Sequence, residues 1–201
     1  MASIRINQSN QRTMNTEGSF PVKPIRTNEN WNNLRMGRST QEQVNEVKSW
    51  LQHNTSSRTP DGGDRVGNGF RALFAGSPAS GKAAAALLAQ EAGREVFHIS
   101  LSKVISKYVG ETEKNLDTLF SQAAEHNWIL FFDDADALFD RRTVTTDTQD
   151  SHTAQESVYL LQKIESYGGL VILATGREHH LNDVVLGKLN TVVNFEPQLQ
   201  A

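Results

Sequence analysis

The 201-residue sequence contains no cysteine, which excludes disulfide bonds and zinc sites built on thiolates. It has no apolar stretch near the ~20 residues that span a bilayer, and its first residues show no signal-peptide run. The net charge is −3, and no basic stripe with interleaved aromatic residues is present. We therefore expect a cytoplasmic protein that binds neither nucleic acid nor a membrane.

Composition divides the chain into a polar tail and one globular domain. Residues 1–28 are rich in Asn, Gln, Ser and Thr, and they bury too little apolar surface to offset the entropy of ordering. We expect them to form a flexible tail. The rest of the chain, 29–201, is expected to form a single domain with its core at 68–197, since hydrophobic residues make up 37% of the sequence.

Beyond the tail, short apolar runs alternate with helix-forming segments, as in a parallel α/β sheet. Five strands are expected, over Phe70–Ala75, Glu95–Ile99, Trp128–Phe132, Leu170–Ala174 and Val192–Phe195. Helices are expected over Gln41–His53 (with Thr40 as N-cap), Ala83–Ala92, Lys103–Tyr108, Glu111–His126 and Gln155–Tyr167, and a loop over Asp140–Gln155. The prediction is a three-layer α/β domain around a central parallel five-stranded sheet.

A glycine-rich segment between a predicted strand and a predicted helix has the pattern of a phosphate-binding loop. Glycine lets the backbone curl so that successive N–H groups point at an anion, and the next helix adds its partial positive charge. Lys82 would reach the β- and γ-phosphates of a nucleotide. The alternative is an ordinary strand-to-helix turn. The residues expected to bind ATP or ADP are Gly76, Ser77, Pro78, Ala79, Ser80, Gly81, Lys82, Ala83 and Ala84.

The predicted strand Trp128–Phe132 is followed by two carboxylates, Asp133 and Asp134. Parallel sheets bind ligands beyond the carboxyl ends of their strands. Asp133 should therefore approach the Mg²⁺ ion of a bound nucleotide, as a Walker B aspartate does. A solvated acidic strand end is the alternative, and the βα unit between Lys82 and Asp133 favours the functional interpretation.

Several motifs, in the right order, resemble the AAA family of ATPases over roughly residues 29 to 197. The segment Lys107-Tyr108-Val109-Gly110 and the helix after it resemble the family's first pore loop. Asp133–Phe139 resembles its Walker B segment, and Trp50–Asn54 and Ile172–Thr175 also fit the family. The resemblance extends most to bacterial AAA proteins, some of them encoded with phage-tail-like contractile injection systems.

This resemblance implies a ring of subunits, homo- or hetero-oligomeric, that hydrolyses ATP and remodels a protein threaded through its pore. Lys107, Tyr108, Val109 and Gly110 would form the substrate pore loop, with Tyr108 as the gripping aromatic; a tyrosine packed on the surface is the alternative. The family's helical lid is expected to be absent, because the sequence ends at Ala201.

The sequence departs from the family at the positions that serve hydrolysis. Ala83 replaces the Ser or Thr that binds Mg²⁺, so the metal site is expected to be weakened. Asp134 replaces the water-activating glutamate and is one methylene shorter, and a misplacement of about 1 Å costs ~10²-fold in rate. Gly176 stands at the first sensor position, where a polar residue is expected.

Two further departures concern the neighbouring subunit and the phosphate loop. Gly187 and Lys188 stand where the family has paired arginines, and an arginine finger contributes ~10³–10⁵ in rate. Lys188 keeps the charge without the planar fork. Ala79 replaces a glycine, which strains the loop if that position needs a positive φ.

The departures favour a pseudo-ATPase, a degenerate nucleotide-binding domain with a scaffold or regulatory role in a protein assembly. One alternative is an active AAA ATPase that remodels a protein substrate. The other is a nucleotide-free structural interaction domain. The presence of Lys82 argues against this alternative, because an empty loop would not need a phosphate-binding lysine.

The loss of the hydroxyl at Ala83 generates a prediction about Mg²⁺. Phosphate contacts from the backbone and from Lys82 need no metal, so we expect modest nucleotide affinity that changes little when Mg²⁺ is withheld. Calorimetric titration with and without Mg²⁺ measures this. A strong dependence on Mg²⁺ would contradict the interpretation of Ala83.

Overall fold

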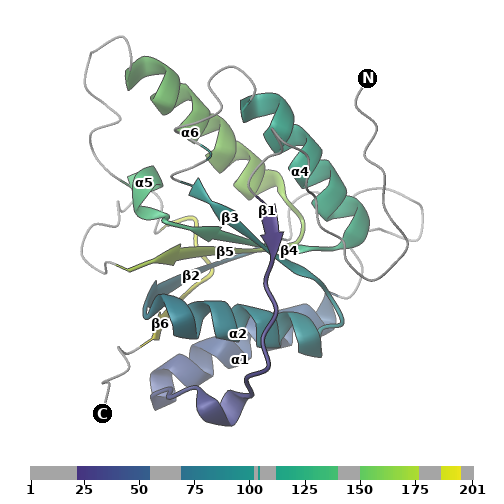
Figure 1. The fold of residues 1–201 in the computed structure, drawn as a ribbon, viewed down its shortest axis with the longest axis vertical. Coiled ribbons are helices and arrows are strands. Elements are labelled where there is room, and N and C mark those ends of the chain that lie inside the picture. Colours follow the sequence, from purple (N-terminus) through teal and green to yellow (C-terminus); the bar gives the residue numbers. More distant parts are fainter. Residues whose placement is uncertain are drawn as a thin grey trace.

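A central sheet with helices on both faces forms the three expected layers (Figure 1). The computed structural model describes residues 22–54, 69–101, 104, 112–139, 150–176 and 187–195. One face is covered by α1 (Arg38–His53) and α2 (Pro78–Glu91), and the other by α4 (Thr112–His126) and α6 (Asp150–Ser166). Within these described ranges, no helix is long and apolar enough to cross a membrane.

The sheet has six strands in the order β1-β3-β4-β5-β2-β6. They are β1 (Val22–Pro24), β2 (Phe70–Gly76), β3 (Val96–Ser100), β4 (Ile129–Asp133), β5 (Leu170–Thr175) and β6 (Thr191–Phe195). Strands β2 to β6 are parallel and coincide with the five predicted strands to within one residue at each end. Their carboxyl ends therefore meet along one edge, as the sequence predicted.

The sixth strand corrects the prediction of five strands and shortens the expected tail. Strand β1 pairs antiparallel with β3, with Val22 opposite Ile99, and the N–H of Ile25 donates to the carbonyl of Val96 at 2.9 Å. Residues 22–28 therefore belong to the folded domain, while residues 1–21 lie outside the described part. The composition of residues 1–28 did not indicate this strand, because Val22 is its one buried side chain.

Helix boundaries differ from the prediction at two places besides the phosphate loop. Helix α1 begins at Arg38 after Gly37, and the hydroxyl of Thr40 donates to the carbonyl of Asn194 at 2.7 Å instead of capping the helix. Helix α6 begins at Asp150, so part of the expected polar loop is helical. The expected short helix over Lys103–Tyr108 lies outside the described residues except for Val104.

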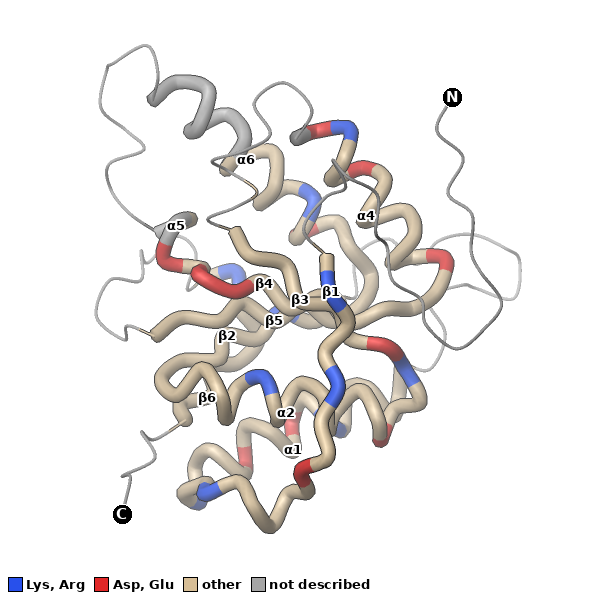
Figure 2. Tube along the Cα trace, viewed as in Figure 1, with Lys and Arg blue, Asp and Glu red and all other residues tan. Residues whose placement is uncertain are grey.

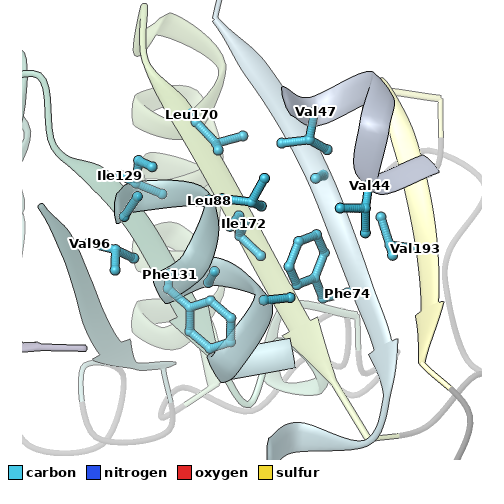
Figure 3. Close-up of a cluster of buried hydrophobic side chains, with 14 of the residues drawn as sticks. Val44, Val47, Phe74, Leu88, Val96, Ile129, Phe131, Leu170, Ile172 and Val193 are labelled. Atoms are coloured by element: carbon cyan, nitrogen blue, oxygen red, sulfur yellow. The ribbon is translucent and has the colours of Figure 1, made fainter. Parts of the chain in front are cut away.

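Each face of the sheet has its own apolar core. Figure 3 shows the core beneath α1 and α2, where Val44, Val47 and Leu88 meet Phe74 and Ile172. Helix α2 is apolar on most sides and packs beside α1 on this face of the sheet, so its middle, Ala84–Ala89, is buried. The second core lies beneath α4 and α6 and includes Leu116, Leu119, Phe120, Leu160 and Ile164. The first of these two cores holds α2 against β2, the strand that precedes it.

Arg71 in β2 ties the end of α6 to the sheet. Its guanidinium donates to the carbonyls of Ile164 at 3.2 Å and Tyr167 at 3.0 Å, and also to those of Gly69 and Glu165. The last carbonyls of a helix have no partner within the helix, and Arg71 supplies one. This contact lies at the amino edge of the sheet, opposite the carboxyl edge.

Replacing Arg71 should destabilise the domain. Arg71→Met leaves several partly buried carbonyls without a donor, so we expect the free energy of unfolding to fall by ~2–3 kcal/mol in urea titrations. The control is Arg38→Met, which removes an exposed pair with Glu42 and should change it by less than ~0.5 kcal/mol. Equal effects of the two changes would show that the Arg71 contacts do not stabilise the fold.

Candidate functional site

The carboxyl edge of the sheet brings together the lysine and the aspartate that the sequence singled out. Lys82 lies in α2 and Asp133 ends β4, and the Lys82 Nζ is 2.6 Å from the Asp133 Oδ2. Asp134 and Asp136 follow directly, and Figure 2 shows this acidic stretch between β4 and α5 (Asp136–Phe139). The strand order places β5 between β4 and β2, so the ion pair spans the end of β5.

Both carboxylate oxygens of Asp133 are engaged. The Nε2 of His98 donates to Oδ2 at 2.9 Å, and the backbone N–H of Asp134 donates to Oδ1 at 3.0 Å. The hydrogen bond from His98, helped by the ammonium of Lys82, holds the pKa of Asp133 well below its ordinary value although burial opposes the shift. Asp133 is therefore an ionised carboxylate that already has three cationic or hydrogen-bonding partners, His98, Lys82 and the backbone N–H of Asp134.

The contribution of His98 was missed at the level of the sequence. His98 lies in β3, next to β4, and its ring stacks on Phe131 with centroids 6.1 Å apart. The available signal was a histidine two residues before the end of a strand that lies beside the acidic one. Using that signal requires the register of β3 against β4, which pairs Ser100 with Asp133.

Asp134, at the expected water-activating position, is turned toward β3. Its backbone has φ of 58°, a left-handed conformation that Asp adopts more readily than most residues. Its Oδ2 accepts a hydrogen bond from the buried hydroxyl of Ser100 at 3.0 Å. On the next strand, the hydroxyl of Thr175 donates to the carboxylate of Asp136, which joins the end of β5 to α5.

The phosphate loop does not have the expected curled backbone. Helix α2 begins at Pro78 instead of Ala83, with Ser77 as its N-cap. The Ser77 Oγ accepts from the Ser80 N–H at 3.4 Å, and the Gly81 N–H donates to the Ser77 carbonyl at 3.0 Å. Proline suits the first position of a helix, and alanine is the strongest helix former, so Pro78 and Ala79 favour this first turn.

The two glycines of the loop have different roles. Gly76 has φ of 96°, and a Cβ there would lie 2.1 Å from the backbone oxygen of Phe195 in β6. Gly76 is therefore required by a close approach of two strands. Gly81 lies inside α2, where a Cβ would meet Phe74 at an ordinary 3.8 Å. Nothing in this conformation requires a glycine at Gly81.

The remaining predicted positions lie in α2, next to strand ends, or outside the described residues. Ala83 is half-buried against the core beneath α1, and Ala84 is fully buried. Gly176 follows β5, with open space where a Cβ would be. Lys188, after Gly187, pairs with Glu165 before β6 begins and so lies toward the opposite, amino edge. The predicted pore loop, Lys107 to Gly110, lies outside the described residues.

The side chains at this edge suit a phosphate better than a metal ion. Lys82 supplies a positive charge beside the amino end of a helix, and both attract the negative charge of a nucleotide phosphate. A metal would find Asp133 tied to Lys82 and His98 and would find no hydroxyl at Ala83. No group of three or more His, Asp or Glu side chains able to hold a metal occurs in the described ranges. The residues thus fit Mg²⁺ poorly.

Known proteins resemble this chain in sequence and in fold. Residues 72–197 match the sequence profile of the ATPase family associated with various cellular activities (AAA). An uncharacterized AAA family ATPase, y4kL, from Sinorhizobium fredii is 30% identical over 125 residues, which are 62% of this chain and 38% of that protein. Spastin from Xenopus laevis is 35% identical over 119 residues, which are 57% of this chain and 20% of spastin.

A solved structure shares the fold. The AAA domain of FIGL-1, crystallised in complex with ADP, superposes with a TM-score of 0.63 at 18% identity and covers 87% of this chain and 57% of that one. The chain spans less than half the length of the curated relatives described above.

The two loop glycines generate opposite predictions. Gly76→Ala should lower the free energy of unfolding by ~3 kcal/mol, because the methyl group would collide with the Phe195 backbone at a positive φ. Gly81→Ala should raise it by up to ~1 kcal/mol, because alanine favours the helix and its methyl group would make only an ordinary contact with Phe74. Urea unfolding of both variants tests this. Strong destabilisation by Gly81→Ala would contradict the helical turn.

Proposed function

The chain belongs to the AAA family, and on that premise we propose that it is a nucleotide-binding domain that does not hydrolyse ATP efficiently. In this proposal ATP or ADP is bound through the phosphate loop, and the domain acts as a scaffold or regulator in a protein assembly. The observation that carries the proposal is the carboxyl edge of the sheet, where the phosphate-binding lysine is kept and the groups for hydrolysis are not.

Lys82 supports nucleotide binding. Its ammonium lies at the carboxyl edge beside the end of β4, at the amino end of a helix whose dipole favours an anion. Gly76, the first glycine of the loop, is kept for a steric reason that does not depend on catalysis. A bound nucleotide would therefore be held mainly by Lys82 and the start of α2.

Three positions argue against efficient hydrolysis. Ala83 offers no oxygen to a metal, which removes one expected ligand of Mg²⁺. Asp134 lacks the extra methylene of a glutamate, and its carboxylate accepts a hydrogen bond from Ser100 of β3. Gly176 supplies no polar group after β5. Each change weakens the positioning of water or metal, and together they affect one chemical step.

Assembly into a homo- or hetero-oligomeric ring is part of the same proposal. Lys188 lies toward the amino edge, so it is placed away from the Lys82 of its own chain and would serve only a neighbouring subunit. Serving a neighbour would also require it to leave Glu165. A pore loop at Lys107 to Gly110, a cytoplasmic location and a link to phage-tail-like contractile injection systems rest on the motif resemblance alone.

Calorimetric titration with ATP and with ADP tests the binding half of the proposal. Lys82→Ala should weaken binding at least tenfold, since a charge-assisted hydrogen bond contributes about 1.5–3 kcal/mol. Lys163→Ala is the matched control, because Lys163 pairs with Asp117 beneath the other face of the sheet and should leave affinity unchanged. Absence of binding by the unaltered protein would instead favour a nucleotide-free structural domain.

Single-turnover hydrolysis of bound ATP tests the claim that the domain does not hydrolyse ATP efficiently. We expect almost no product over the time in which ordinary enzymes, at about 1–10³ turnovers per second, complete the reaction. Rapid, complete conversion with Mg²⁺ would establish the alternative of an active ATPase.

A further inference from the structure

We propose that the phosphate loop has a closed state, in which Pro78–Gly81 form the first turn of α2 and must unwind before a nucleotide phosphate can bind. We further propose that Ala79 sets the balance between the closed and the open state. This inference rests on the proposed function and adds a conformational step to it.

The closed state is defined by where the backbone N–H groups of the loop point. A phosphate cradle needs several successive N–H groups directed at one anion. Here Pro78 has no N–H, and the N–H groups of Ser80 and Gly81 donate to the side chain and the carbonyl of Ser77. The N–H of Ser77 itself donates to the Phe195 carbonyl at 3.1 Å. Three of the donors that would hold a phosphate are thus already used within the protein.

Side chains reinforce the same turn. The hydroxyl of Ser80 donates to the Ser77 Oγ at 3.0 Å, and the Ser80 side chain is buried. At the other end of the turn, Lys82 lies 2.6 Å from Asp133, which His98 also holds. An incoming phosphate must therefore displace a carboxylate from Lys82 as well as unwind the turn.

Ala79 contributes to the closed state without packing against anything in the core. It is exposed at the second position of the helix. Alanine favours a helix over glycine by about fivefold in the equilibrium constant. The AAA resemblance places a glycine at this position, so the replacement adds helical preference where a phosphate loop needs curled backbone. Gly76 and Gly81 flank the turn and can accommodate the change of backbone direction.

The test compares the unaltered protein with Ala79→Gly in two measurements. Without nucleotide, NMR-resolved hydrogen exchange should show protected Gly81 and Lys82 amides that exchange about fivefold faster in Ala79→Gly. Calorimetry with ADP should show binding that is tighter in Ala79→Gly by up to about fivefold. Ser121→Gly is the control, since Ser121 is an exposed position in the middle of α4 and should change neither result.

Each outcome decides a separate claim. Unprotected Gly81 and Lys82 amides in the unaltered protein would overturn the closed state. Faster exchange in Ala79→Gly with unchanged ADP affinity would overturn the claim that the turn limits binding. Protected amides together with no ADP binding in either protein would overturn the proposed function and still support the closed turn.

Discussion

The ion pair between Lys82 and Asp133 is the contact on which the organisation of the site depends. It joins α2, on one face of the sheet, to the end of β4, with β5 between β4 and β2. It forms because parallel strands end at one edge and because the buried, alanine-rich α2 is fixed against β2. His98 holds the same carboxylate from β3, so three neighbouring elements are linked through one side chain.

The phosphate loop shows a conflict between local preference and inherited pattern. The glycines at both ends and the lysine are those of a phosphate loop, whereas Pro78 and Ala79 favour the start of a helix. The helix prevails in this conformation, and the N–H groups of Ser80 and Gly81, which a phosphate would need, donate within its first turn. The fold of the AAA family is kept around this turn.

Five strands could be predicted because short apolar runs, and the alternating segment Glu95–Ile99, recur between helix-forming segments. The meeting of Lys82 and Asp133 followed from the same topology. Strand β1 could not be predicted because it depends on backbone pairing with β3 and a single buried valine. His98 was missed because its partner lies on another strand, and the start of α2 was missed because the glycine pattern outweighed the helix preference of Pro78 and Ala79.

The most direct test of this account is the set of Cα and Cβ chemical shifts of Ala79, Ser80 and Gly81, measured by NMR with and without saturating ADP. The account predicts helical shifts in the nucleotide-free protein, as for the rest of α2, and their loss when ADP binds. Loop-like shifts without nucleotide, or helical shifts that persist in the ADP-saturated protein, would contradict it.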